Sequence, residues 1–266
     1  VRANWFEKRV LFGRRIVLTR PAGQVSMFKE KLELLGAEVI ELPLIKILPS
    51  EDKKVIAEVF AGIATYEWAV FTSANGAREF MRLFFLAYGD IRCFGPMRIA
   101  CVGESTAEVF RNHCLEVEIV AEKSIAESLA KELVATDSLD SANVLVVSGN
   151  RNRQVLVKML EDVGHAIVDT LPLYETDFTD VTEATDFPKF REFGADAIIF
   201  TSSSTALSYI EQEEDLVLDE NAIKPVICSF GPETTKTLLE NELAVDLECT
   251  NPSIEDMINK LVKYFS

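Results

Sequence analysis

Histidine and closely spaced cysteine are scarce in this sequence of 266 residues. The two histidines, His113 and His165, stand in no metal-binding or catalytic-triad spacing, and the apolar segments beside them indicate structural roles. The five cysteines are scattered without a C-x-x-C pair, at Cys93, Cys101, Cys114, Cys228 and Cys249. This pattern argues against a zinc site or a disulfide framework and favours reduced thiols in a cytosolic protein. We therefore expect no metal.

Long apolar runs and an excess of positive charge are also absent. No run of about 18 uncharged apolar residues occurs, and the first residues lack the charged-then-apolar pattern of a signal peptide. We therefore expect a cytoplasmic protein that does not enter a membrane. The formal net charge of −16 argues against a nucleic-acid partner. A local site for an anion is still allowed, because salt screens the general field over about 8 Å.

Strand-like and helix-like segments alternate along the chain, which predicts an α/β fold. Five pairs of turn residues are each separated by 128 or 129 residues, which indicates a tandem duplication with halves of about 13–141 and 142–266. These pairs are Gly36 and Gly164, Pro43 and Pro172, Thr72 and Thr201, Gly103 and Gly231, and Ser124 and Ser253. Two similar parallel-sheet domains are the expected product. The stretch that follows Thr176, up to Phe193, is interpreted as variable and acidic, and no helix or strand is assigned to it.

The turns that join strands to helices are the candidate binding sites, because open α/β sheets bind ligands beyond the carboxyl ends of their strands. Three such turns in each half offer backbone N–H groups, hydroxyls and a few cations, which suit a ligand with several carboxylates or phosphates. No glycine-rich nucleotide motif, nucleophile elbow or catalytic triad is present. The candidate binding residues are Arg20, Thr72, Ser73, Gly103, Thr106, Gly149, Arg153, Thr201, Ser202, Ser203, Gly231 and Thr234.

Each candidate also has an ordinary structural interpretation. The hydroxyls of residues 201–204 stand where a helix needs an N-cap. Gly103 and Gly231 can simply permit tight turns, and Arg153 can be a solvated helix residue. A lone aromatic near a domain boundary, such as Tyr174, serves packing more often than chemistry.

Seven short motifs, in their order and spacing, resemble the uroporphyrinogen-III synthase family over about residues 14–266. They are Val17-Leu-Thr-Arg-Pro21, Val70-Phe-Thr-Ser73, Val102-Gly-x-x-Thr-Ala107, Gly149-x-x-x-Arg153, Leu173-Tyr174, Phe200-Thr-Ser202 and Phe230-Gly-Pro-x-Thr234. The lead-in, Asn4-Trp-Phe-Glu-Lys and Leu11-Phe-Gly-Arg-Arg15, resembles the junction at which this enzyme is fused behind uroporphyrinogen-III C-methyltransferase. The resemblance therefore implies that the chain is the C-terminal part of a bifunctional polypeptide.

The resemblance also implies a topology that the repeat alone does not give. The first βαβ unit of each half joins the later part of the other half. One domain is then residues 1–43 with 176–266, and the other is residues 44–175. Two connections cross between them as a short antiparallel ladder, with a cleft between the domains.

The activity that the resemblance implies is a cofactor-independent lyase reaction of tetrapyrrole biosynthesis, on the route to haem and sirohaem. The linear tetrapyrrole hydroxymethylbilane is cyclised to uroporphyrinogen III, with loss of water and inversion of ring D through a spiro intermediate. Tyr174 matches the family's tyrosine and is the candidate proton donor to the departing hydroxide. Ser73 and Ser202 match the family's T-S turns, and Thr106 and Thr234 match its G-x-x-T positions. The implied protein partners are a fused or separate methyltransferase and an upstream deaminase.

Two other functions remain open from the residues themselves. One is a two-lobed binding module for an anionic metabolite, without chemistry. The other is a phosphosugar isomerase-like enzyme, because hydroxyl-rich turns also hold phosphate. An isomerase would need a catalytic Glu or His beside the turns, and the sequence offers no obvious candidate.

Overall fold

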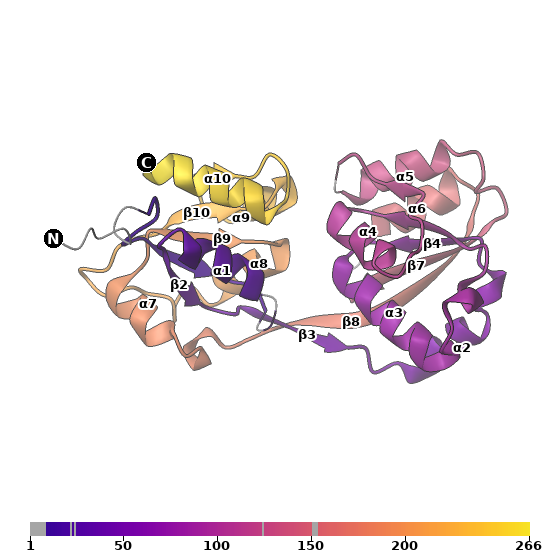
Figure 1. The fold of residues 1–266 in the computed structure, drawn as a ribbon, viewed down its shortest axis with the longest axis horizontal. Helices are drawn as coiled ribbons and strands as arrows, with labels where there is room; N and C mark the ends of the chain where they lie inside the picture. The colour runs from indigo at the N-terminus through magenta and orange to yellow at the C-terminus, as the bar shows by residue number, and fades with distance from the viewer. Residues whose placement is uncertain (1–8, 22, 24, 124, 151–153) are drawn as a thin grey trace. The chain divides into compact units, whose positions relative to one another are not determined.

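A computed structural model describes residues 9–21, 23, 25–123, 125–150 and 154–266. The chain divides into two compact units (Figure 1). Unit 1 comprises Val1–Lys46 and Asp177–Ser266, and unit 2 comprises Ile47–Thr176. Strands β3 (Ile45–Pro49) and β8 (Ile167–Phe178) carry the chain from one unit to the other.

Unit 1 contains a parallel sheet of five strands in the order β11-β10-β9-β1-β2. The strands are β1 (Arg15–Leu18), β2 (Glu38–Glu41), β9 (Ala197–Phe200), β10 (Val226–Ser229) and β11 (Leu247–Glu248). The central strand β9 is buried at every residue, as expected of a parallel sheet with helices on both faces.

Helices cover both faces of this sheet. The buried side chains of α1 (Ser26–Leu34) and α10 (Ile254–Phe265) form one apolar core with the strands. Those of α7 (Phe187–Phe193), α8 (Ser203–Glu211) and α9 (Pro232–Glu240) form a second core. A short 3-10 segment, Val181–Glu183, precedes α7.

Unit 2 contains a sheet of six strands in the order β3-β8-β7-β4-β5-β6. The remaining strands are β4 (Trp68–Phe71), β5 (Arg98–Cys101), β6 (Ile119–Val120) and β7 (Asn143–Gly149). A phenylalanine-rich core includes residues of α2 (Lys53–Ala61), α3 (Ala74–Tyr88) and α4 (Glu104–Arg111). The other core includes α5 (Ala126–Val134) and α6 (Gln154–Asp162), and 3-10 segments occupy Ile63–Thr65 and Ile91–Phe94.

The predicted fold class is confirmed: the sheets are largely parallel, and each combines strands from both halves of the sequence. Strand β1 pairs with β9, and β4 pairs with β7. The connecting strands β3 and β8 run antiparallel, since the Ser50 N–H donates to Leu173 O and the Thr179 N–H donates to Leu44 O, both at 3.0 Å.

The stretch up to Phe193 has regular structure, although the sequence analysis assigned no helix or strand to it. It contains α7, which buries Phe187 and Phe190 against the sheet of unit 1. Pro188 stands in the first turn, where a missing N–H costs no hydrogen bond. A helix of only two turns shows too little periodicity in the sequence to be distinguished from a loop.

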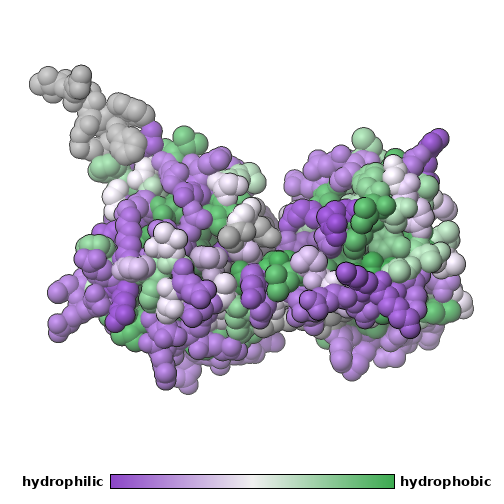
Figure 2. Space-filling view, turned by 90° about the horizontal axis from the view of Figure 1, so that it is seen from below, coloured by the Kyte–Doolittle hydropathy of each residue, from purple (hydrophilic) through white to green (hydrophobic). Residues whose placement is uncertain are grey.

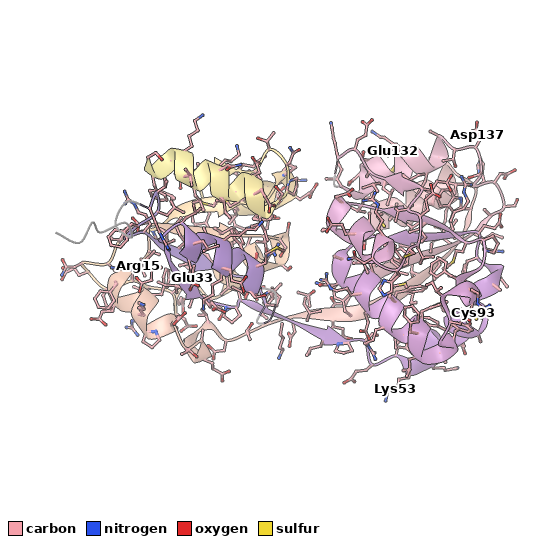
Figure 3. All side chains as sticks on the ribbon, in the orientation of Figure 1. Arg15, Glu33, Lys53, Cys93, Glu132 and Asp137 are labelled. Carbon is pink, nitrogen blue, oxygen red and sulfur yellow. The ribbon has the colours of Figure 1, made fainter. Side chains whose placement is uncertain are left out.

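Polar side chains dominate the face shown in Figure 2, with small apolar areas between them. Cys93 and Cys114 are exposed, and Figure 3 labels Cys93, which lies in the 3-10 segment Ile91–Phe94. Cys101 is enclosed in the core, and burial raises the pKa of its thiol to about 12. No helix in the described part of the chain is long and apolar enough to span a membrane.

A pair of glycines with the same backbone conformation tests the packing at the start of β9. Gly194 (φ 65°, ψ −157°) and Gly95 (φ 64°, ψ −152°) both have positive φ. A Cβ on Gly194 would lie 1.9 Å from the carbonyl oxygen of Ile223, whereas a Cβ on Gly95 would meet nothing within 4 Å. Gly194→Ala should therefore cost at least about 2 kcal/mol more unfolding free energy than Gly95→Ala in urea denaturation. Equal costs would show that the Ile223 contact is unimportant.

Candidate functional site

The strand-to-helix turns of unit 2 lie along one edge of its sheet. Backbone hydrogen bonds continue past the strand ends, from Thr72 N to Val147 O (3.2 Å) and from Val102 N to Phe71 O (3.0 Å). The turns at Gly149, at Thr72 and at Gly103 therefore follow three neighbouring strands, β7, β4 and β5. The structure thus brings these predicted binding residues to one edge.

Tyr174 reaches this edge from β8 because the pairing of β8 with β7 shifts. Ser148 is opposite Pro172, but Gly149 is opposite Tyr174, so the ladder skips a residue. Pro172 has no N–H to donate, which favours such an irregularity. The Asn150 N–H then donates to Tyr174 O at 3.0 Å and fixes the backbone on the far side of the shift.

The Tyr174 ring packs directly on glycine backbone. A Cβ on Gly149 would lie 2.6 Å from the Cε2 and Cζ atoms of the ring, which real structures do not tolerate. A Cβ on Gly76, in the first turn of α3, would lie at an ordinary 3.6 Å from Cε1. Gly149 was predicted as a binding residue, and the structure gives it a further role: it makes room for the phenol.

The Tyr174 hydroxyl and the Ser73 hydroxyl form a hydrogen bond of 2.9 Å. Ser73 is also the N-cap of α3, because its Oγ accepts from the Gly76 N–H at 3.1 Å. Burial raises the pKa of Tyr174 above its ordinary value, and the hydrogen bond with Ser73 partly opposes this. The phenol is therefore protonated at neutral pH and can donate a proton.

The other predicted residues of unit 2 lie at the start of α4. Gly103 is the N-cap of that helix, and the Thr106 N–H donates to its carbonyl at 3.0 Å. Thr106 is only 3 % exposed, so this residue offers a ligand little surface. Arg153 lies outside the described residues.

Unit 1 carries a second set of turns on its own sheet edge. Ser202 is the N-cap of α8 and forms a capping box with Thr205. The Ser203 hydroxyl donates to Glu233 O at 3.1 Å and so connects this turn to the start of α9. Gly231 is the N-cap of α9, and Pro232 stands in the first helical position.

The remaining predicted residues of unit 1 border these turns. The Arg20 guanidinium lies over the Phe230 ring, 5.3 Å from its centroid, and is half-buried. Thr201 is half-buried at the end of β9, whereas Thr234 is only 5 % exposed. Thr234, like Thr106, therefore has its side chain largely enclosed.

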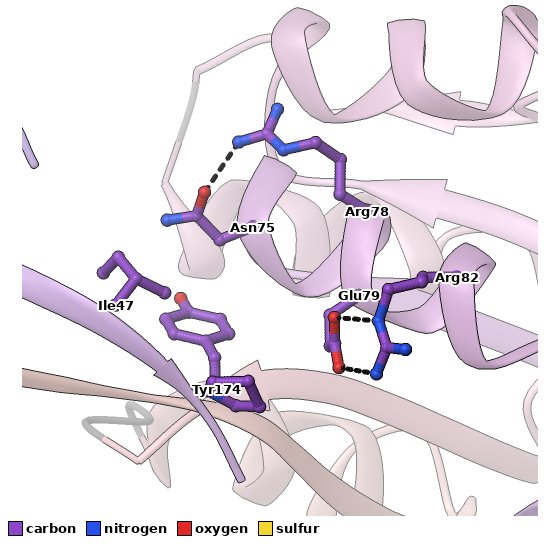
Figure 4. Close-up of a pocket in the computed structure, with 7 residues that line it drawn as sticks. Ile47, Asn75, Arg78, Glu79, Arg82 and Tyr174 are labelled. Atoms are coloured by element: carbon purple, nitrogen blue, oxygen red, sulfur yellow. Dashed lines mark hydrogen bonds and ion pairs between the residues drawn. The ribbon is translucent and has the colours of Figure 1, made fainter. Parts of the chain in front are cut away.

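A pocket of about 250 Å³ adjoins Tyr174 in unit 2 (Figure 4). Its lining combines two strands with one face of α3, and consists of Ile47, Pro49, Asn75, Arg78, Glu79, Arg82 and Tyr174. Sequence reasoning missed Arg78 and Arg82, because it considered cations only within the turns. Arg78 and Arg82 are four residues apart in the helix that follows the Thr72 turn, so the sequence already places both on one side of that helix. That spacing was the signal from which they could have been found.

No metal is suggested by the side chains that the structure describes. Within the described ranges, three or more His, Cys, Asp or Glu residues do not gather where an ion could be held. The chemistry that this edge offers is a neutral phenol, hydroxyls, backbone N–H groups at helix N-termini and arginine side chains. Such groups bind anions and can transfer a proton.

Comparison with known proteins identifies the family. The sequence model of one protein family, described as uroporphyrinogen-III synthase HemD, matches residues 26–259. The chain belongs to the uroporphyrinogen-III synthase family. These enzymes cyclise hydroxymethylbilane in tetrapyrrole biosynthesis, so the chain is an enzyme of that class.

Individual relatives agree with this assignment. A porphyrin biosynthesis protein HemD of Ruminiclostridium josui is 26% identical over 98% of this chain and 50% of its own length. A uroporphyrinogen-III synthase of Synechococcus elongatus is 29% identical over 93% of this chain and 94% of its own length. The chain thus spans about half the length of the first relative. A uroporphyrinogen-III C-methyltransferase of Bacillus subtilis matches only 34% of this chain and 18% of its own length, at 32% identity.

Solved structures support the fold. A mutant uroporphyrinogen III synthase of Thermus thermophilus superposes with a TM-score of 0.65 at 16% identity, over 94% of this chain and 98% of its own. A uroporphyrinogen-III synthetase of Helicobacter pylori gives a TM-score of 0.61 at the same identity, over 94% of this chain and 99% of its own. At this identity the likeness concerns the fold alone.

Two glycine substitutions test how tightly the Tyr174 ring is held. Gly149→Ala should cost about 1–3 kcal/mol of unfolding free energy, because the ring or the backbone must move. Gly76→Ala should be neutral or stabilising by up to about 1 kcal/mol, since its Cβ fits and alanine favours the helix. Denaturant unfolding of both variants measures the difference. A Gly149→Ala variant as stable as the wild type would contradict the packing described here.

Proposed function

We propose that the chain cyclises hydroxymethylbilane to uroporphyrinogen III with inversion of ring D, and that Tyr174 starts the reaction by protonating the departing hydroxide. The observation that supports this most is the placement of Tyr174. A phenol with a raised pKa is held by Gly149 and Ser73 at the edge where three helix-starting turns meet. A proton donor beside anion-binding turns suits a polycarboxylate that must lose a hydroxyl group.

The proposed steps balance protons and electrons without a cofactor. Tyr174 donates its proton as the C–O bond of the hydroxymethyl group breaks, while the pyrrole nitrogen supplies electrons, and water and a protonated azafulvene result, with Tyr174 left as the phenolate. Ring D attacks that azafulvene through its substituted carbon and forms the spiro intermediate. The bond from ring D to its original neighbour breaks, and the fragment recloses at the free carbon of ring D. The proton that ring D then loses restores the phenol.

The turns of both units are proposed to bind the eight carboxylates of the substrate. Helices α3, α4, α8 and α9 each begin at a strand end, and their first N–H groups favour negative charge. Backbone donors of this kind are preorganised and select a folded substrate over an extended one. The proposed binding residues are Arg20, Thr72, Ser73, Gly103, Thr106, Gly149, Arg153, Thr201, Ser202, Ser203, Gly231 and Thr234.

The domain boundaries, fusion and location are proposed as well. We infer domains of residues 1–43 with 176–266, and of residues 44–175. Support comes from the two compact units, whose divisions fall within three residues of these boundaries.

A fused or separate methyltransferase is supported by the half-length match to the HemD protein of R. josui and by the partial match to a methyltransferase. We also propose a cytoplasmic location and, as the family resemblance implies, an upstream deaminase as a partner.

The residues alone also allowed a binding module without chemistry in place of an enzyme. The two are distinguished by supplying hydroxymethylbilane and separating the type I and type III uroporphyrinogen isomers. The synthase should give type III faster than the spontaneous ring closure gives type I. Type I alone, as formed in buffer, would contradict the proposal.

Replacing Tyr174 with phenylalanine removes the proton donor and keeps the ring. We expect Tyr174→Phe to lower kcat for type III formation by about 100-fold, the usual scale of general acid catalysis. Tyr264→Phe is the matched control, because Tyr264 is half-exposed on α10 and far along the chain from the turns. Unchanged turnover in Tyr174→Phe would remove this residue from the mechanism.

The direction of the pKa shift of Tyr174 gives a test by pH. A raised pKa keeps the phenol protonated until the pH passes a value above about 10, so kcat should fall through loss of this proton only there. Tyr174→Phe should lack that alkaline fall. If an alkaline fall with a midpoint between about pH 6 and 9 disappeared in Tyr174→Phe, the assigned protonation state would be wrong.

A further inference from the structure

We propose that Arg78 binds one carboxylate of the tetrapyrrole in the pocket beside Tyr174. This inference rests on the proposed function, because it takes a polycarboxylate tetrapyrrole as the ligand. It adds a binding residue that none of the matched turn motifs contains. A carboxylate held there belongs to a ring close to the phenol, so Arg78 would set the position of the reacting end of the substrate.

The pocket places Arg78 and Tyr174 around the same space. Both residues line it, Arg78 from the exposed side of α3 and Tyr174 from β8 (Figure 4). Ile47 and Pro49 of β3 supply an apolar wall opposite the helix. An apolar wall with a cation at its rim suits a pyrrole ring that carries an acidic side chain.

Arg78 has a neutral hydrogen-bond partner. Its Nη2 donates to the amide oxygen Oδ1 of Asn75 at 2.6 Å. No carboxylate of the described chain lies within ion-pair distance of Arg78. The contact with Asn75 orients the guanidinium and leaves its positive charge uncompensated. A substrate carboxylate can therefore form a charge-assisted, bidentate pair with it.

Arg82, one turn further along α3, differs in this respect. Its Nε and Nη2 donate to the two carboxylate oxygens of Glu79 at 2.8 and 2.7 Å. That bidentate pair already compensates the charge of Arg82. The two arginines line one pocket, and only Arg78 is available to an incoming anion.

The internal repeat shows that Arg78 is not among the features that the two halves of the chain share. Helices α3 and α8 begin at positions separated by 129 residues, with Ser73 and Ser202 as their N-caps. The same separation places Leu207 of α8 at the position of Arg78, and Glu211 at that of Arg82. The frame folds without cations at these positions, so stability of the helix does not require Arg78.

The test compares Arg78→Gln with wild type. The variant should raise KM for hydroxymethylbilane by about 5- to 20-fold while kcat changes by less than about twofold, because one partly exposed charge-assisted contact is lost. The Kd for uroporphyrin III, the stable oxidised octacarboxylate, should rise by a similar factor. Arg78→Lys keeps the charge and should recover part of the affinity.

Two controls separate the charge at this site from the general charge of the protein. Arg92→Gln removes the same charge from an 87 % exposed side chain that pairs with Asp90, outside the pocket, and should leave KM and Kd unchanged. Raising the ionic strength to about 1 M, where charges are screened over about 3 Å, should reduce the difference between wild type and Arg78→Gln.

The outcomes distinguish this inference from the proposed function. A folded Arg78→Gln variant with unchanged KM and unchanged Kd for uroporphyrin III would overturn the role of Arg78, even if the wild type forms type III. A wild type that forms only type I would overturn the proposed function. The binding measurement would then still test Arg78, because uroporphyrin binding needs no turnover.

Discussion

The contact between the Tyr174 ring and the backbone at Gly149 is the constraint on which the site depends. The ring lies where any larger residue at position 149 would place its Cβ, 2.6 Å from the ring carbons. The ladder shift after Pro172 brings Tyr174 opposite Gly149, and Ser73 joins the phenol to the cap of α3. One hydroxyl thus both caps a helix and orients the Tyr174 phenol. Because Ser73, Gly149 and Tyr174 come from neighbouring strands, the sheet itself holds them in register.

Duplication supplies the frame, and a difference between the copies supplies the proposed proton donor. Ser73 and Ser202 are equivalent N-caps, as are Gly103 and Gly231, so each unit presents helix N-termini at a sheet edge. The repeat position of Tyr174 is occupied by Ile45, which is buried at 5 % exposure. Unit 1 therefore offers turns without a phenol at that position. In the proposed function, binding is distributed over a repeated backbone design, whereas proton donation belongs to unit 2.

Local rules explain which features were predictable from the sequence. N-caps such as Ser202 and Gly231 depend on the residues of a single turn, and the repeat itself is visible as a constant separation. Features that depend on tertiary contacts were not predictable. Burial of Thr106 and Thr234, the length of α7 and the fit of Gly149 to a ring from another strand all require the packed sheet. The carboxylate-binding role proposed for Arg78 was not predictable either. It depends on the neutral partner Asn75, which sequence spacing alone does not reveal.

The central claim is that Tyr174 is a neutral phenol in contact with the tetrapyrrole. Nuclear magnetic resonance of protein labelled with carbon-13 at tyrosine Cζ, with the Tyr174 signal assigned by its loss in Tyr174→Phe, tests this most directly. The account predicts a signal of the protonated phenol from neutral pH to above about pH 10, which shifts when uroporphyrin III is added. A tyrosinate signal at neutral pH, or a Tyr174 signal that saturating uroporphyrin III leaves unchanged, would contradict it.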